Sequence, residues 1–61
     1  MILYYNHSER NVTIEDTFEI ISIDEAKKLF DDGEVSDSNQ AFTTLRLCNW
    51  DYNKVVEYYG E

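Results

Sequence analysis

A single cysteine, Cys48, and a single histidine, His7, restrict most strongly how this chain of 61 residues can hold a fold together. Domains below about 70–80 residues commonly depend on disulfide bonds, a structural metal or a partner subunit. One cysteine cannot form an internal disulfide, and one cysteine with one histidine cannot complete a zinc site. The chain must therefore rely on the packing of its own side chains or on association with another chain.

Aromatic side chains are the material that the composition offers for such packing, with one Trp, five Tyr and three Phe. Aromatic rings bury a large area per residue and are also enriched at protein interfaces. Residues 1–61 are expected to form a single domain with a small core. The rings that such a core cannot hold favour contact with a partner protein, a second copy in a homodimer included.

Acidic residues outnumber basic residues by 13 to 5, which gives a formal net charge of -8. Nucleic-acid binding needs basic side chains that neutralise phosphates, so direct binding to DNA or RNA is not expected. Two interpretations of the charge stay open. It is either a solvated shell that keeps a small protein in solution, or a surface that imitates nucleic acid.

The sequence carries no sign of a membrane segment. No apolar run approaches the roughly 18 residues that a membrane-spanning helix needs. The residues from Met1 to Tyr5 lack the basic segment of a secretion signal. A free thiol fits a reducing compartment. We therefore expect a cytoplasmic protein that makes no membrane contact.

Two runs near the N-terminus have the pattern of β-strands. The first, from Ile2 to Tyr5, is short, apolar and aromatic. The second, from Val12 to Ile21, alternates apolar with polar residues, which is the period of a half-buried strand. Asp16 interrupts its apolar face and predicts a bulge or bend. Because the residues between the two runs are polar, we expect residues 1–21 to form a two-stranded antiparallel hairpin.

The first helix is predicted directly after this hairpin. Ser22 and Glu25 have the spacing of a capping box, in which the serine oxygen accepts from the backbone N–H of the glutamate. Gly33 is well placed to end the helix in the left-handed conformation.

Two more helices are predicted in the remainder of residues 22–61. The second begins with Asp37 as its cap, although a strand over residues 42–47 stays an alternative because that stretch is rich in β-formers. The third begins with Asp51 as its cap and ends at Gly60. Its apolar residues have helical spacing: Tyr52, Val55, Val56 and Tyr59.

The order of these parts, from Ile23 to Tyr59, resembles the ubiquitin-associated (UBA) domain and its wider UBA-like relatives. The likeness consists of a capped helix, a Gly-containing loop, a helix with Ala41, and the turn Asn49-Trp50-Asp51 before the last helix. The resemblance implies a three-helix bundle on which the N-terminal hairpin packs, so the expected fold class is α+β. The hairpin has no counterpart in that family.

Ubiquitin-binding members of that family present an apolar loop after the first helix and a leucine pair late in the third. Here the first loop carries Asp31 and Asp32, and Tyr58 and Tyr59 occupy the late positions. The resemblance therefore implies the fold more directly than it implies ubiquitin binding, which is kept as the last of the functional interpretations.

No residue pattern in the sequence predicts catalysis, a cofactor or a metal site. His7 lies in a polar loop, and Cys48 falls on the apolar face of the second helix, where a buried structural thiol is expected. The acidic pair Asp31-Asp32 lacks the alternating ligand spacing of a calcium loop. We expect a protein that is not an enzyme.

The leading interpretation is a small non-catalytic protein–protein interaction module. The alternative is an acidic inhibitor or nucleic-acid mimic of the kind that phages and mobile elements carry, which binds a basic DNA-binding protein. The candidate partner-binding residues lie off the helical stripes, at the last turn or in the acidic loop: Tyr58, Leu47, Trp50, Asp31 and Asp32.

Overall fold

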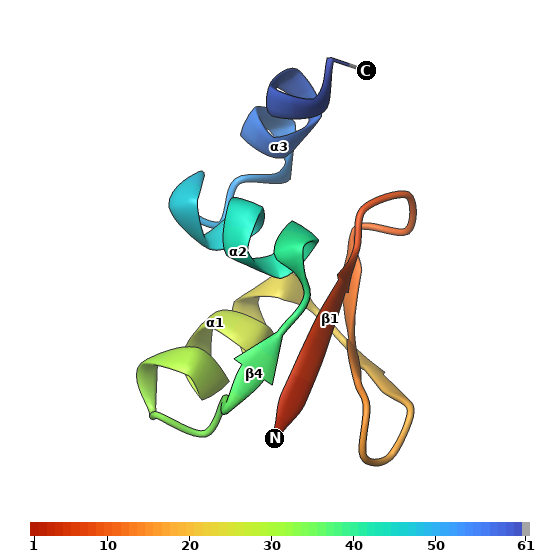
Figure 1. Cartoon of the computed structure of the whole chain (residues 1–61), viewed down its shortest axis with the longest axis vertical. Helices are drawn as coiled ribbons and strands as arrows, with labels where there is room; N and C mark the ends of the chain where they lie inside the picture. Colours follow the sequence, from red (N-terminus) through yellow and green to blue (C-terminus); the bar gives the residue numbers. More distant parts are fainter. Residues whose placement is uncertain (61) are drawn as a thin grey trace.

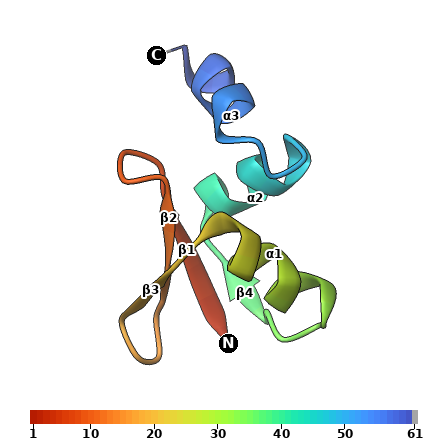
Figure 2. The ribbon, with the colours of Figure 1, turned by 180° about the vertical axis from the view of Figure 1, so that it is seen from behind.

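The computed structural model describes residues 1–60, which form an α+β fold with a four-stranded sheet and three helices (Figure 1). The strands are β1 (Ile2–Asn6), β2 (Asn11–Ile14), β3 (Glu19–Ile21) and β4 (Asp37–Ser38). The helices are α1 (Ile23–Asp31), α2 (Gln40–Leu47) and α3 (Tyr52–Tyr59). Helices α1 and α2 pack on one face of the sheet, and α3 lies beyond α2 at one end of the molecule (Figure 2).

The sheet has the strand order β3-β2-β1-β4 and is mixed. β1 pairs with β2 and β2 with β3 in the antiparallel sense, whereas β4 pairs with β1 in parallel. The expected two-stranded hairpin over residues 1–21 is therefore wrong in extent. The turn between the first two strands is confirmed, but the predicted second strand is two strands, and a fourth one comes from the loop after α1.

The run from Val12 to Ile21 divides because a four-residue turn separates Ile14 from its partner Glu19. The register pairs Val12 with Ile21, so even-numbered residues of β2 and odd-numbered residues of β3 share the core-facing side. Ile20, which the alternation placed with Val12, instead points to the opposite face and is 58% exposed. Asp16 is predicted to mark a bulge or bend within one strand. In the structure it lies in the turn of residues 15–18 that ends β2.

The UBA-like three-helix bundle is wrong. The hydrophobic core is shared between the sheet and the helices: Leu3, Tyr5, Val12, Ala26, Phe42, Leu45 and Val55. Three of these residues come from β1 and β2, so the N-terminal strands are part of the core and not an addition to a bundle. β4 also lies between α1 and α2 in the chain and ties their connection to β1. This arrangement removes the structural basis for transferring ubiquitin binding to the chain.

The helix boundaries follow most of the predicted signals. Ser22 accepts from the backbone N–H of Glu25, and Asp51 accepts from that of Asn53, so both predicted caps are confirmed. Gly33 and Gly60 have φ angles of 77° and 76°, the left-handed conformation that glycine adopts without strain.

The predicted cap of the second helix is wrong, because Asp37 lies in β4 and Asn39 caps α2 instead. The asparagine side chain accepts from the backbone N–H of Phe42 at 3.0 Å and also bonds to the backbone of β1. Residues 42–47 are helical, which settles the alternative between helix and strand.

Candidate functional site

The face of the sheet that points away from α1 and α2 is the first candidate surface, and we call it the outer face. The register aligns Tyr4 with Thr13 and Thr13 with Ile20, so these three side chains form a row across β1, β2 and β3. None of the three is buried. Among residues 1–60 no helix covers this face (Figures 1 and 2). The outer face therefore presents an aromatic and an aliphatic side chain to solvent.

Phe18 is the last residue of the β2–β3 turn and lies two residues before Ile20 in the chain. Its side chain is 79% exposed, and its backbone has a φ angle of 59°. The left-handed conformation costs a residue with a Cβ atom about 1–2 kcal/mol and is normally given to Gly, Asn or Asp. Phe18 is thus both conformationally strained and solvent-exposed.

The β1–β2 turn has the same geometry and shows what is unusual about Phe18. In each turn the fourth residue donates its N–H to the last residue of the preceding strand at 2.7 Å, Arg10 to Asn6 and Phe18 to Ile14. Arg10 has a φ angle of 58°, close to that of Phe18. Its guanidinium lies 4.7 Å from the centre of the Tyr52 ring, a cation–π contact that stabilises it there. Phe18 carries its ring into solvent instead.

Two carboxylates, Glu15 and Asp37, lie near Tyr4 on the outer face. Glu15 acts on the Tyr4 phenol both by its charge and as an acceptor for the phenolic proton, and Asp37 contributes a second negative charge to the raised pKa. The pKa of Tyr4 is raised above its ordinary value, first by partial burial and then by these two carboxylates. Like any tyrosine the phenol is neutral near pH 7, and the raised pKa keeps it protonated to a higher pH than usual.

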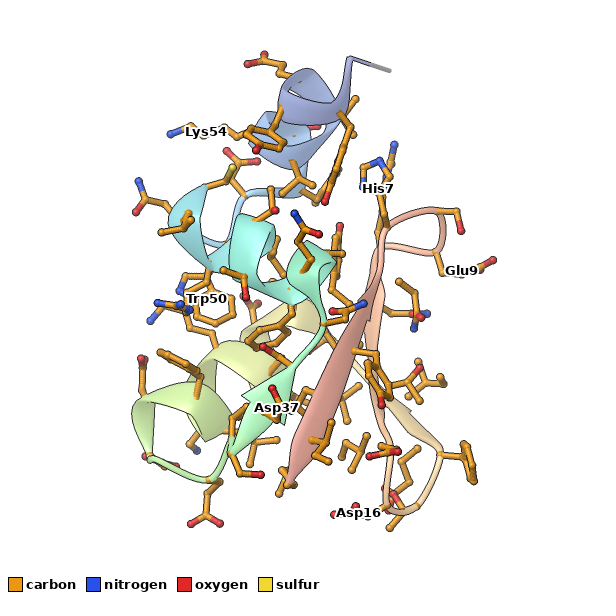
Figure 3. The ribbon with its side chains drawn as sticks, viewed as in Figure 1. His7, Glu9, Asp16, Asp37, Trp50 and Lys54 are labelled. Atoms are coloured by element: carbon orange, nitrogen blue, oxygen red, sulfur yellow. The ribbon has the colours of Figure 1, made fainter. Side chains whose placement is uncertain are left out.

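A hollow between β3 and α1 is the second feature of this end of the molecule. It has a volume of about 480 Å³, and we call it the β3–α1 groove. Its apolar lining consists of Met1, Ile14, Ile21 and Leu29. Its polar lining consists of Glu19, Glu25, Lys28 and Asp32, three acids and one base. The β2–β3 turn, which contains Asp16, lies at the same end of the molecule as this groove, whereas Lys54 of α3 lies at the opposite end (Figure 3).

The structure places two of the sequence-predicted contact residues on the surface, away from the strands. Leu47 at the end of α2 is 74% exposed, and Tyr58 on α3 is 69% exposed. The Tyr58 ring packs edge-on against Tyr59 with 5.3 Å between ring centres, and Tyr59 lies 5.1 Å from the His7 ring. His7 is thus part of an aromatic group and not an isolated surface residue.

Trp50 has a packing role in the structure. Its ring centre lies 5.8 Å from that of Phe30 and 5.5 Å from that of Phe42, and its side chain sits between α1 and α2 (Figure 3). Trp50 and Asn49 both have positive φ angles, 64° and 59°, which is how the chain reverses between α2 and α3. A contact of Trp50 with a partner stays a prediction.

The predicted acidic pair divides between two positions. Asp31 forms an exposed ion pair with Lys27 at 3.0 Å, one turn back on α1. Asp32 is the C-terminal cap of α1 and lines the β3–α1 groove. Only Asp32 of the five predicted contact residues therefore lines this groove.

No group of three or more His, Cys, Asp or Glu side chains in residues 1–60 is arranged to hold a metal ion. Over that range, no helix combines the length and apolar character that crossing a membrane requires. Cys48 is half-buried and packs against the core.

Comparisons of the chain with family models, with curated proteins and with solved structures find no match. Sequence reasoning missed Phe18 and Ile20 because it assigned both to the buried face of one long strand. The signal that could have separated them is the polar run Glu15-Asp16-Thr17, in which Asp16 and, more weakly, Thr17 favour turns.

Proposed function

We propose that the chain is a non-catalytic protein-interaction module that binds a positively charged protein through the outer face of its sheet. The observation that carries the proposal is Phe18, a 79% exposed aromatic side chain on a backbone with a φ angle of 59°. Strained conformations of this kind concentrate at functional sites. Aromatic anchors are also frequent among the residues that dominate binding energy.

Stability alone does not account for phenylalanine at this position. A glycine at position 18 would adopt the same backbone conformation without the steric cost. The phenyl ring gains little from packing in the isolated chain, since most of its surface is in water. A partner that covers the ring would recover that apolar surface at roughly 25 cal/mol per Å². Function in binding thus explains both the residue type and its exposure.

The charge distribution indicates which kind of partner fits. Between Asn11 and Ala26 the sequence contains five acidic residues and no basic residue. This segment contains β2, β3, the turn with Phe18 and the first turn of α1. A second copy with a net charge of -8 would be repelled, whereas a basic protein would be attracted. An inhibitor of a basic DNA-binding protein is a special case of this proposal.

The experiment that tests the proposal compares capture of partners by the wild-type chain and by Phe18→Gly, with Leu47→Ala and Tyr58→Ala as matched variants at exposed positions. A basic protein should be retained by the wild-type chain and by both matched variants. It should be lost with Phe18→Gly and released by added salt. Loss with Tyr58→Ala and retention with Phe18→Gly would move the site to α3 and contradict the outer-face assignment.

A further inference from the structure

β3 is the terminal strand of the sheet, and Ile20 presents its backbone groups at the free edge. Neighbouring residues in an antiparallel ladder direct their N–H and C=O groups to alternate sides. The Ile14 carbonyl accepts from Phe18 on the β3 side, so Thr13 directs its groups toward β1. Ile20 is opposite Thr13 and therefore points its own N–H and C=O away from β2. This donor and acceptor are available to one further strand.

The β3–α1 groove lies beside that edge and is formed in part by β3 itself. Ile21 and Glu19 of β3 line it, together with Leu29 of α1. Side chains of a strand alternate between the two faces of a sheet. A strand added next to β3 would therefore direct one set of side chains over the groove and the other set toward Ile20 on the outer face. The groove's volume of about 480 Å³ is enough for apolar side chains from such a strand.

The charges at this edge discriminate between occupants. Glu19, Glu25 and Asp32 are the acids of the groove, and Lys28 is its base. Acidic residues on an edge strand oppose pairing with another acidic copy of the same chain, which is one way in which proteins protect free edges. The same residues attract an extended segment that carries lysine or arginine.

We propose that β3 binds an extended, basic and apolar segment of the partner protein as a fifth strand of the sheet, paired through the backbone of Ile20. The proposal rests on the proposed function and adds the mode of recognition to it. Main-chain hydrogen bonds give such strand addition its affinity, and the pockets for alternate side chains give it specificity. Phe18 and Ile20 then contact the outward side chains of the segment, while Leu29 and Ile21 contact the inward ones.

The test uses a short capped peptide in which lysine and valine alternate, titrated into the full chain and followed by NMR. The expected result is saturable binding, slowed hydrogen exchange of the Ile20 amide, and nuclear Overhauser contacts from the peptide to Leu29. Two control peptides separate charge from pairing. One has glutamate in place of lysine, and the other carries N-methyl groups on the backbone nitrogens that would face β3. Each is expected to lose at least about tenfold in affinity. The glutamate peptide loses its attraction to the acids of the groove. The N-methylated peptide loses the hydrogen bond to the Ile20 carbonyl and places methyl groups against β3.

Variants of the chain provide a second, independent arm. Ile20→Pro removes the outward N–H at a position where an edge strand tolerates proline, and Ile20→Ala shortens the side chain but keeps the N–H. Strand addition predicts that Ile20→Pro weakens peptide binding by about tenfold more than Ile20→Ala. Leu29→Lys should also weaken it, whereas Leu47→Lys on α2 should leave it unchanged.

Three results would overturn the strand-addition proposal. The first is equal affinity for the N-methylated peptide and the parent peptide. If a basic partner is still lost with Phe18→Gly in that case, the proposed function stands and only the recognition mode fails. The second is failure of the alternating peptide to bind while the basic partner is captured normally. The third is protection of the Ile20 amide in the chain alone together with a dimer in sedimentation, which would assign the edge to a second copy.

Discussion

The side-chain amide of Asn39 forms two hydrogen bonds with the backbone of Tyr5, the pairing that a neighbouring strand residue would make. Its oxygen accepts from the Tyr5 N–H at 3.0 Å, and its nitrogen donates to the Tyr5 carbonyl at 3.2 Å. The same oxygen accepts from the N–H of Phe42 and thereby caps α2. β4 ends one residue earlier, at Ser38. Asn39 thus continues the pairing of β1 with a side chain while the backbone turns into a helix.

Replacement of Asn39 by alanine should therefore destabilise the chain by about 2–4 kcal/mol, because it removes a helix cap and leaves two backbone groups without partners. Asn39→Ser should recover part of the loss, since serine can cap a helix but cannot reach both groups of Tyr5. Urea denaturation followed by circular dichroism measures both values. Asn53→Ala, at an exposed position of α3, is the matched control. A loss no larger than that of the control would show that the asparagine bonds contribute little.

Replacement of Phe18 by glycine should raise the free energy of unfolding by about 0.5–1 kcal/mol, because relief of the left-handed strain exceeds the entropy that glycine gains in the unfolded chain. Arg10→Gly is the matched variant at the equivalent position of the other turn. It should gain less, since it also loses the contact with Tyr52 that is worth about 0.5–1 kcal/mol.

Thermal and urea unfolding of the two variants give the comparison. A marked loss of stability in Phe18→Gly would mean that the phenyl ring stabilises the isolated chain, and the functional explanation of its exposure would then fail.

The local signals of this sequence predict local structure well. Ser22 and Asp51 cap helices as predicted, and Gly33 adopts the left-handed conformation. Each of these signals acts within about one turn of the chain, where hydrogen-bond geometry depends on a few neighbouring residues. They do not report how the elements are arranged in space.

The long-range pairings could not be read from the sequence. The β4–β1 pairing joins Asp37 to Ile2, and neither residue alone indicates a strand of two residues. Asp37 has the residue type of a helix cap, but it lies in β4. Asn39 caps α2 instead, and its side-chain amide also bonds to the backbone of Tyr5 in β1. The face to which Ile20 points depends on the number of residues in the turn between β2 and β3. Because side chains alternate along a strand, a turn with one residue more or less would have placed Ile20 on the core-facing side.

Replacement of Tyr5 by phenylalanine should leave stability unchanged or raise it by up to about 1 kcal/mol. The Tyr5 side chain is 2% exposed, and its hydroxyl group has no hydrogen-bond partner among residues 1–60. A buried polar group without a partner costs free energy, and phenylalanine keeps the ring while it removes that group. Burial also raises the pKa of the Tyr5 phenol.

Urea denaturation of Tyr5→Phe tests this expectation, with Tyr52→Phe at a half-buried position as the matched control. A loss of more than about 1 kcal/mol for Tyr5→Phe would show that the hydroxyl group makes a stabilising interaction in solution.

The ionisation of Tyr4 should reduce stability at high pH, and Glu15 should control part of the effect. The pKa of Tyr4 is raised in the folded chain by partial burial, by the charge and hydrogen bond of Glu15, and by Asp37. The folded state therefore holds the phenolic proton more tightly than the unfolded state does. The resulting stability is complete below the ordinary tyrosine pKa of about 10 and is lost as the pH rises through the raised value.

Glu15→Gln removes one negative charge beside the phenol, so the pKa of Tyr4 should fall toward its value in the unfolded chain and the alkaline loss of stability should shrink. NMR titration of the Tyr4 ring carbons, with the urea-unfolded chain as reference, measures the pKa in both variants. Asp16→Asn, in the turn next to Glu15, is the control for a general change of net charge. If Asp16→Asn lowers the pKa of Tyr4 as much as Glu15→Gln does, the shift arises from the overall negative field and not from the contact with Glu15.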